Sequence, residues 1–197
     1  MTCDIAVPEQ VDEALAATTA ERGAPQWLTV TAGIGHAAPL ATADPAEFDR
    51  VISVNTRGVW LTMRAFQPAM SAAGGGSIVA TSSLSGRLPD RTMGLYCASK
   101  AALDMLVRVA ALEWGPQRVR VNAVAPGVTE TPMLGPVPRG RGWLADVDRR
   151  TALGGLGASA DVASAVLALH DLDWVTGQVL ECDGGLGLHS PIDPTGG

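Results

Sequence analysis

The chain has 197 residues, which is enough for one domain of ordinary size with a substantial core. Its residues are 47% hydrophobic and 17% charged, a composition typical of globular rather than disordered chains. The formal net charge of −6 argues against an extended nucleic-acid-binding surface. No stretch approaches 18 uninterrupted apolar residues and the first residues lack the features of a signal peptide, so we expect neither a membrane span nor a secretory leader.

The cysteines are three isolated residues without a Cys-x-x-Cys pair: Cys3, Cys97 and Cys182. This odd, scattered set argues against a disulfide framework and against a zinc site. We therefore expect no metal, and a cytoplasmic location where thiols stay reduced.

The first half of the chain contains two expected helices on either side of a short strand. Apolar residues at helical spacing predict a helix over 11–20, and the β-rich run at 27–30 predicts a strand. A second helix begins at Asp44, the predicted N-cap, where Glu47 is placed to complete a capping box. We expect this helix to continue over 44–70, until three glycines end it.

The second half repeats the same alternation of strand and helix. This rhythm predicts an α/β fold with a parallel sheet and helices on both faces, in one domain over 1–188 followed by a loosely held tail over 189–197. The expected elements are a strand at 77–81, a long helix at 96–114, a strand at 119–124, a short helix at 161–169 and a strand at 178–181.

Tyr96 and Lys100 are four residues apart at the start of the long helix. At this spacing both side chains lie on one face, one turn apart. A free tyrosine has a pKa near 10, but a neighbouring ammonium and a helix N-terminus both favour the phenolate. The pair therefore predicts a tyrosine general acid/base, and a hydroxyl from the serines at 82–83 is placed to hold a substrate oxygen.

These residues resemble the short-chain dehydrogenase/reductase family, and the resemblance covers essentially the whole chain. Residues 96–100 match the family's Tyr-x-Ala-Ser-Lys motif, Ser83 lies thirteen residues before Tyr96 at the position of the catalytic serine, and Asn55 matches the family's helix asparagine. The family is NAD- or NADP-dependent and interconverts secondary alcohols and ketones. The resemblance implies that Tyr96 is the acid/base, Lys100 lowers its pKa and binds the nicotinamide ribose, Ser83 holds the substrate oxygen and Asn55 supports a proton-relay water.

The resemblance also implies a set of cofactor contacts. Residues 126–131 match the family's Pro-Gly-x-x-x-Thr segment at the nicotinamide amide, and residues 32–33 retain the Ala-Gly half of its Asn-Asn-Ala-Gly motif, where the backbone approaches the ribose. An aspartate near the amino terminus corresponds to one beside the adenine ring. The implied cofactor-binding residues are Asp4, Ala32, Gly33, Tyr96, Lys100, Pro126, Gly127, Val128 and Thr131.

Two departures from the family pattern affect the nucleotide site. Val30 and Thr31 replace the two asparagines, and nothing in the chain matches the Gly-rich turn that presents backbone N–H groups to the pyrophosphate. We therefore expect a doubly wound, Rossmann-like sheet truncated at its N-terminus, without the first two βα units, or roughly 60 residues at about 30 per unit. The strand at 27–30 would then have an unpaired edge, the short segment at Cys3 would lack a neighbour, and NAD or NADP would bind weakly.

Three interpretations of the chain follow. The favoured one is an oxidoreductase acting on a small alcohol or ketone, whose sequence is recorded from a late start or is otherwise truncated. The alternatives are a non-catalytic remnant that serves as an interaction subunit, and a ligand-binding regulator that retains the fold. The apolar surfaces of the helices at 44–70 and 96–114 predict a homo-oligomer, a tetramer or a dimer. The irregular segment 133–150 is typical of a substrate lid. Arg139 and Arg141 in this segment could contact an anionic substrate, but the favoured interpretation is that they contact solvent.

Overall fold

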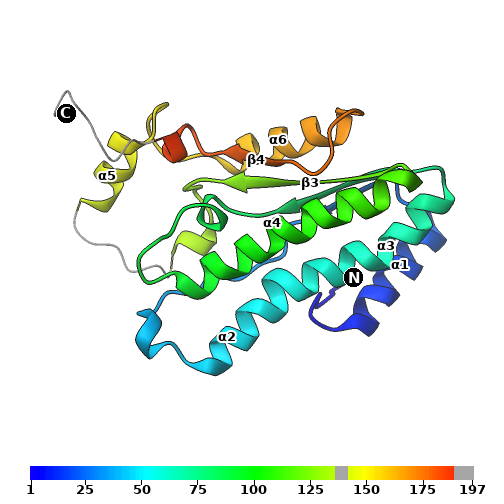
Figure 1. Cartoon of the computed structure of the whole chain (residues 1–197), viewed down its shortest axis with the longest axis horizontal. Helices are drawn as coiled ribbons and strands as arrows, with labels where there is room; N and C mark the ends of the chain where they lie inside the picture. Colours follow the sequence, from blue (N-terminus) through cyan, green and yellow to red (C-terminus); the bar gives the residue numbers. More distant parts are fainter. Residues whose placement is uncertain (136–141, 189–197) are drawn as a thin grey trace.

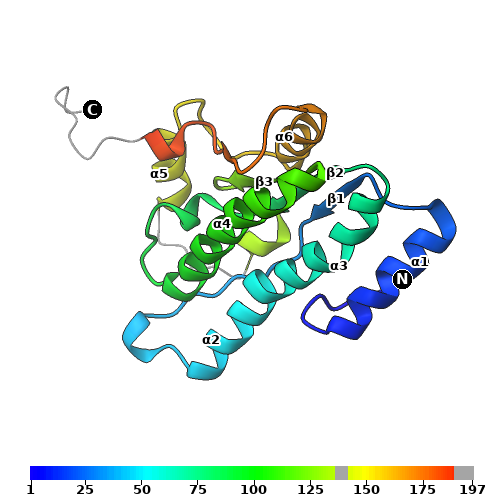
Figure 2. The same ribbon diagram turned by 45° about the vertical axis from the view of Figure 1, so that its right-hand side comes forward.

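A computed structural model describes residues 1–135 and 142–188 of the chain, and it confirms the expected α/β fold (Figure 1). Four parallel strands form one sheet in the order β1-β2-β3-β4. Helices α3 and α4 pack on one face of this sheet, with α1 beside α3, and α6 covers the other face (Figures 1 and 2). The elements are α1 (Pro8–Arg22), β1 (Trp27–Val30), α2 (Pro45–Ile52), α3 (Val59–Ala72), β2 (Gly76–Thr81), α4 (Gly94–Trp114), β3 (Val119–Pro126), α5 (Trp143–Arg150), α6 (Ser159–Asp171) and β4 (Val179–Cys182).

The central strands β2 and β3 are buried on both faces, as parallel strands between two helical layers must be. Successive side chains of a strand point to opposite faces. Ile78 accordingly joins the cluster under α3 and α4, while its neighbour Val79 packs against α6. The two clusters hold the carboxyl ends of β2 and β3 in a fixed position between the helices.

The single helix expected over 44–70 is instead two α-helices, α2 and α3, joined by a π-helical turn at Ser53–Gly58. Such turns are rare and occur frequently at functional sites. At the start of α2, Asp44 accepts the Ala46 N–H at 2.9 Å, as expected of an N-cap. The expected capping box is wrong, because the Glu47 carboxylate accepts from the Arg50 guanidinium at 2.6 Å instead.

The amino-terminal segment before α1 is not a strand. It packs through Ile5 against Gly58, where a Cβ would lie 2.9 Å from Ile5 Cγ1. Strand β1 pairs with β2 along one edge, and no other strand of the described residues pairs with its second edge, as expected. Helix α1 is longer than expected because Pro8 fits the first helical turn, where its missing N–H is no loss.

The expected irregular lid at 133–150 contains a regular helix, α5, in which Arg149 pairs with Asp146 at 2.6 Å. Arg139, Arg141 and the expected tail at 189–197 lie outside the described residues. Within 1–135 and 142–188, no helix has both the length and the apolar character needed to cross a bilayer.

Candidate active site

The segments singled out in the sequence meet at the carboxyl ends of the parallel strands. The chain leaves β1 into the loop at 31–35, leaves β2 into Ser82 and Ser83, and leaves β3 into the segment at 127–131. In open parallel sheets, ligands bind at this edge. Helix α4 begins beside it and carries the tyrosine and the lysine (Figure 1).

Tyr96 and Lys100 lie one turn apart in the first part of α4, as expected, and both are buried. The Lys100 Nζ lies 5.7 Å from the centroid of the Tyr96 ring. It donates a hydrogen bond to the Thr81 carbonyl oxygen at 2.8 Å, which ties the helix to the end of β2. The helix and the strand thus hold the phenol and the ammonium as neighbours.

Burial determines the direction of both pKa shifts. It raises the pKa of Tyr96 above its ordinary value, and a hydrogen bond with Ser83 partly offsets this rise. The sequence-based expectation of a lowered tyrosine pKa is therefore wrong for this structure, because removing the phenolate from water outweighs the groups that stabilise it. Burial also lowers the pKa of Lys100 to about 8, against the opposing attraction of the Asp104 carboxylate.

Ser83 is held by the turn that follows it. It is the N-cap of the 3₁₀ turn Leu84–Gly86, and its Oγ accepts the Ser85 N–H at 3.2 Å. The same hydroxyl is hydrogen-bonded with Tyr96. The structure thus brings together the serine and the tyrosine that the family resemblance had paired.

Asn55 lies in the π-helical turn and is fully buried. Its Oδ1 accepts the Ile34 N–H at 2.8 Å, and its Nδ2 donates to the Ile34 carbonyl at 2.9 Å and to Ser99 Oγ at 3.1 Å. These bonds fasten the loop after β1 to helix α4. The described role of the Asn55 side chain is therefore to hold the loop that carries Ala32 and Gly33.

Gly33 lies close to Asn55 and Lys100. A Cβ built on it would lie 3.4 Å from Asn55 Oδ1 and 3.5 Å from Lys100 Nζ. Ala32, just before it, is exposed. The backbone at this position thus borders the lysine with no side chain between them.

The segment after β3 runs beside the end of β4 and returns toward β1. Pro126 ends β3, and the Gly127 N–H donates to the Cys182 carbonyl at 3.1 Å. A Cβ on Gly127 would lie 2.8 Å from the Asp183 Cα, so this close approach requires glycine.

Further along the same segment, the Val128 carbonyl accepts the Gly157 N–H at 3.0 Å. Thr131 precedes the turn Pro132–Leu134, in which Met133 Cγ lies 3.7 Å from where a Gly35 Cβ would be. The segment therefore lies at the same edge of the sheet as Ser83 and the start of α4.

Asp4 is separate from this cluster. It is exposed, its Oδ1 accepts the Ala6 N–H at 2.9 Å, and its own N–H donates to Gln10 Oε1 at 2.7 Å. These bonds shape the turn before α1. In the described parts of the chain, no group of three or more potential metal-ligating side chains occurs.

Sequence reasoning missed one buried pair beside the site. Ser82 Oγ donates to Asp104 Oδ1 at 2.5 Å, and both residues are buried. The available signal was the spacing of Asp104, which follows Lys100 by four residues on the same helix. It predicts proximity to the lysine but not to Ser82.

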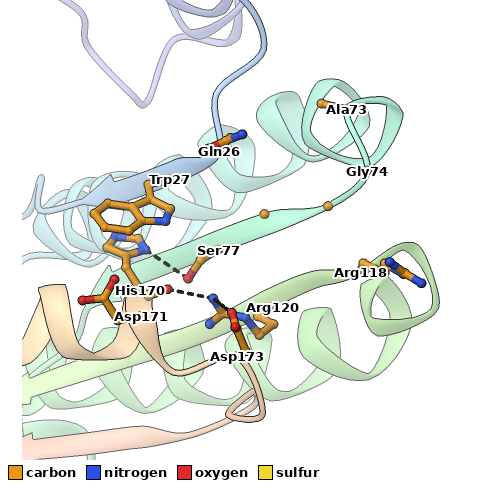
Figure 3. A pocket seen from close by; sticks show the side chains of 12 residues that line it. Gln26, Trp27, Ala73, Gly74, Ser77, Arg118, Arg120, His170, Asp171 and Asp173 are labelled. Atoms are coloured by element: carbon orange, nitrogen blue, oxygen red, sulfur yellow. Dashed lines mark hydrogen bonds and ion pairs between the residues drawn. The ribbon is translucent and has the colours of Figure 1, made fainter.

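A separate hollow of about 450 Å³ lies at the opposite, amino-terminal end of the strands (Figure 3). His170 of α6 bridges two strands there, with Nδ1 3.0 Å from Ser77 Oγ and Nε2 2.9 Å from Thr29 Oγ1. The Trp27 ring stacks on the imidazole with centroids 4.9 Å apart. None of the predicted site residues lies in this hollow.

Comparisons with known proteins identify the family of the chain. Residues 1–187 match the family model described as Enoyl-(Acyl carrier protein) reductase. A galactitol 2-dehydrogenase (L-tagatose-forming) of Cereibacter sphaeroides is 37% identical over 175 residues, which cover 86% of this chain and 69% of that protein.

Solved structures show the same fold. A gluconate 5-dehydrogenase from Burkholderia cenocepacia, in complex with NADP and tartrate, superposes with a TM-score of 0.90 at 30% identity and covers 95% of this chain. A 7α-hydroxysteroid dehydrogenase complexed with NADH and 7-oxo glycochenodeoxycholic acid gives 0.88 at 29% identity over 93% of this chain. This chain spans 74% and 72% of those two chains, and between 59% and 74% of the first curated relatives. The chain belongs to the short-chain dehydrogenase/reductase family, whose members are NAD(P)-dependent oxidoreductases.

Proposed function

We propose that this protein interconverts a secondary alcohol and a ketone by hydride transfer, with Tyr96 as the general acid/base. The observation that carries the proposal is the arrangement of Tyr96, which is hydrogen-bonded with Ser83 and one helical turn from Lys100 at the ligand-binding edge of the sheet. The galactitol, gluconate and hydroxysteroid dehydrogenases similar to this chain have alcohol or ketone substrates by their names. A nicotinamide cofactor, NAD or NADP, supplies or accepts the hydride when bound.

The protein's own residues provide the proton transfer. Tyr96 is protonated at neutral pH, because the ordinary pKa of tyrosine is near 10 and burial raises that of Tyr96 further, so it can donate its proton to a carbonyl oxygen. Ser83 holds that oxygen beside the phenol. Lys100, whose pKa is about 8, carries a positive charge at pH 7 and favours the phenolate that remains after proton transfer.

The backbone near Lys100 provides the place for the nicotinamide ribose. The backbone of Gly33 packs beside the lysine ammonium with no side chain between them, and Asn55 holds that loop in place. In this proposal Asn55 also supports the water through which Lys100 exchanges protons with solvent. Val128 and Thr131 would contact the nicotinamide amide, since their segment spans the same edge.

Tyr96→Phe tests the proposal, because it removes the phenolic hydroxyl and keeps the ring. We expect kcat to fall by at least roughly 10²-fold, with unchanged circular dichroism, in an assay of NAD(P)H absorbance with polyols, sugar acids and hydroxysteroids. Trp174→Phe is the matched control, since Trp174 is fully exposed and its replacement should leave turnover unchanged. Near-normal turnover by Tyr96→Phe would contradict the role of the tyrosine.

A second candidate is a non-catalytic interaction subunit or binding module, and the second edge of β1 favours it. That edge has no strand partner within the described residues, and an open edge can pair with another chain. This alternative would be supported if the folded protein turned over none of the substrate classes above but co-purified in a stable complex with a second family member.

We propose that the protein forms a homo-oligomer through the outer face of α4. Met105, Val109 and Leu112 lie on this face and are 56%, 42% and 79% exposed. Burying such a stripe against another copy removes apolar surface from water. Leu112→Lys should therefore shift the mass measured by light scattering toward the monomer, whereas Asp12→Lys on the exposed side of α1 should not. A wild-type monomer throughout the micromolar range would contradict the proposal.

The proposed location is the cytoplasm. All three cysteines are free thiols and each is half-buried, a state that a reducing compartment preserves. Fractionation of cells expressing a tagged protein would test this, and recovery of the protein in a secreted fraction would contradict it.

A further inference from the structure

We propose that Asp104 is a positioning residue which, through Ser82, clamps the loop carrying Ser83 onto helix α4 and so sets the Ser83–Tyr96 hydrogen bond. The inference deepens the proposed function and depends on it for its catalytic meaning. The clamp consists of Ser82, Gly86 and Asp104, none of which has an assigned role in the mechanism above.

The first part of the clamp is a buried bond between strand end and helix. Asp104 lies one turn beyond Lys100 on α4, and its Oδ1 accepts the Ser82 hydroxyl at 2.5 Å. Ser82 is also bonded to strand β3, because its N–H donates to the Val124 carbonyl at 2.7 Å. The residue immediately before Ser83 is therefore fixed both to the sheet and to the helix that carries Tyr96.

The second part is a close approach of Gly86 to helix α4. A Cβ on Gly86 would lie 2.8 Å from Asp104 Oδ2 and 3.2 Å from the carbonyl carbon of Lys100. The turn that follows Ser83 thus rests directly on α4, between the lysine and the aspartate. The Gly86 N–H donates to the Ser83 carbonyl at 2.9 Å, so the contact at Gly86 is transmitted to Ser83.

A buried carboxylate is costly, which makes a purely space-filling role for Asp104 a poor explanation. Burial raises the pKa of Asp104, while the Ser82 hydrogen bond and the charges of Arg108 and Lys100 act in the opposite direction. The groups that influence Tyr96 are different: Ser83 lowers its pKa, and Cys97 and Asp90 raise it. We therefore expect Asp104 to act on the phenol through the serine loop rather than through its charge.

The two explanations predict opposite changes in the pKa of Tyr96 when Asp104 is removed. If Asp104 holds the serine loop, its removal weakens the Ser83–Tyr96 hydrogen bond, and the pKa of Tyr96 rises further. If Asp104 acted through its negative charge alone, its removal would favour the phenolate and the pKa would fall. A merely structural role would lower thermal stability without moving the pKa in either direction.

The chain contains one tyrosine, so an ultraviolet titration of tyrosinate reports on Tyr96 without any assignment. We expect Ser83→Ala and Asp104→Ala to raise its pKa to a similar extent. In the double variant Ser83→Ala/Asp104→Ala we expect no further rise, because both changes remove the same hydrogen bond. The titration needs neither cofactor nor substrate, so it distinguishes failure of the clamp from failure of the proposed function.

Two matched variants complete the design. Asp104→Asn keeps an oxygen that accepts from Ser82 and should restore the wild-type titration, even though it lacks the charge. Leu103→Ala opens a cavity at the neighbouring core position and should lower the melting temperature without shifting the tyrosine titration. An unchanged pKa in Asp104→Ala, a fall in that pKa, or additive shifts in the double variant would overturn the proposal.

Hydrogen exchange at neutral pH covers the case in which an alanine variant unfolds before the tyrosine titrates. The Ser85 and Gly86 N–H groups bond to Ser83, so they report on the turn directly. In Ser82→Ala we expect faster exchange at these two amides than in wild type, with β2 unchanged. Equal exchange in the turn of the two proteins would overturn the clamp.

Discussion

The two ends of the sheet each contain a buried basic side chain, and the two side chains differ in how their hydrogen-bonding capacity is used. Burial lowers the pKa of both Lys100, at the carboxyl end, and His170, at the amino end. Both ring nitrogens of His170 have hydroxyl partners, and its ring is stacked on Trp27. The described hydrogen bond of Lys100 uses one of its three donors, and the ammonium borders the bare backbone of Gly33.

Among the charged groups around the amino-terminal hollow, Arg120 is held by several partners (Figure 3). Arg120 donates to the carbonyls of Leu169 and His170 at 3.0 and 2.8 Å, at the end of α6, and lies 3.7 Å from Asp173. A guanidinium at a helix C-terminus satisfies carbonyls that the helix leaves unpaired. The paired histidine and arginine indicate a structural role for the amino end. Two of the three Lys100 donors have no described partner, and this unused capacity supports the role proposed for the lysine.

The largest expected effect is on the affinity for NAD(P)(H), which depends on how much of a cofactor site the carboxyl end of the sheet provides. The residues before β1 form an irregular segment and α1, and no Gly-rich turn faces the sheet edge there. Such turns give the pyrophosphate several charge-assisted hydrogen bonds, each worth about 1.5–3 kcal/mol. We predict that these 197 residues bind NAD(H) and NADP(H) at least roughly 10³-fold more weakly than the Burkholderia gluconate 5-dehydrogenase, because three such bonds already exceed that factor.

Isothermal calorimetry with both proteins under the same conditions measures this difference. Lys100→Met in the 197-residue chain is the matched control, since it should abolish any residual binding at the nicotinamide end. Micromolar affinity of the wild-type chain for either cofactor would contradict the prediction and would require a rearranged nucleotide site.

The next effect is the dependence of stability on alkaline pH, which distinguishes Lys100 from His170. The folded-state pKa of Lys100 is about 8, below its ordinary value of 10.5. Between these values the unfolded chain binds more protons than the folded chain, so the free energy of unfolding rises with pH, by up to about 3 kcal/mol for a shift of this size. Below pH 8 the lysine is protonated in both states, and its burial cost is constant.

Urea unfolding at intervals between pH 7 and pH 10 measures this slope. Lys100 is the chain's one lysine, so Lys100→Met removes the lysine contribution completely. Burial raises the pKa values of Tyr96 and Cys182, so near and above the ordinary pKa of each group its titration lowers the free energy of unfolding as the pH rises. This opposing contribution is the same in wild type and variant. A variant with the same slope as the wild type would show that Lys100 does not titrate as a buried group.

The sequence predicted those parts of the site that depend on local geometry. Tyr96 and Lys100 share a helix face because they are four residues apart, and that relation survives in any context that keeps the helix. The position of Ser83 followed from the family resemblance, and the structure places it beside the tyrosine. The alternation of strands and helices likewise predicted the parallel sheet, because strands joined by crossover helices run parallel.

The features that the sequence did not predict depend on partners far away along the chain. Asp104 bonds a serine 22 residues earlier, and His170 bonds Ser77 from 93 residues away. The π-helical turn is held by the bonds of Asn55 with Ile34, and no local pattern marks it. The direction of the Tyr96 pKa shift failed for the same reason, because burial is a property of the tertiary structure.

The smallest predicted effect is that of a substitution at the amino end, which should change the free energy of unfolding but not turnover. His170→Ala removes the stacked partner of Trp27 and leaves the buried Ser77 hydroxyl without its hydrogen bond. An unpaired buried hydroxyl and a lost ring contact together cost about 2 kcal/mol of unfolding free energy. Because His170 does not contact the residues proposed for catalysis, kcat should remain at the wild-type value.

The acid limb of the stability curve provides a second readout for the same variant. Burial lowers the pKa of His170, so below its ordinary value of 6.5 the unfolded chain binds more protons than the folded chain, and wild-type stability falls as the pH drops. His170→Ala should flatten this fall, while Lys100→Met should leave it intact and remove only the alkaline rise. If His170→Ala instead abolished turnover at unchanged stability, the amino end would be a chemical site. The rule that distinguishes the two ends by their unused hydrogen-bonding capacity would then fail.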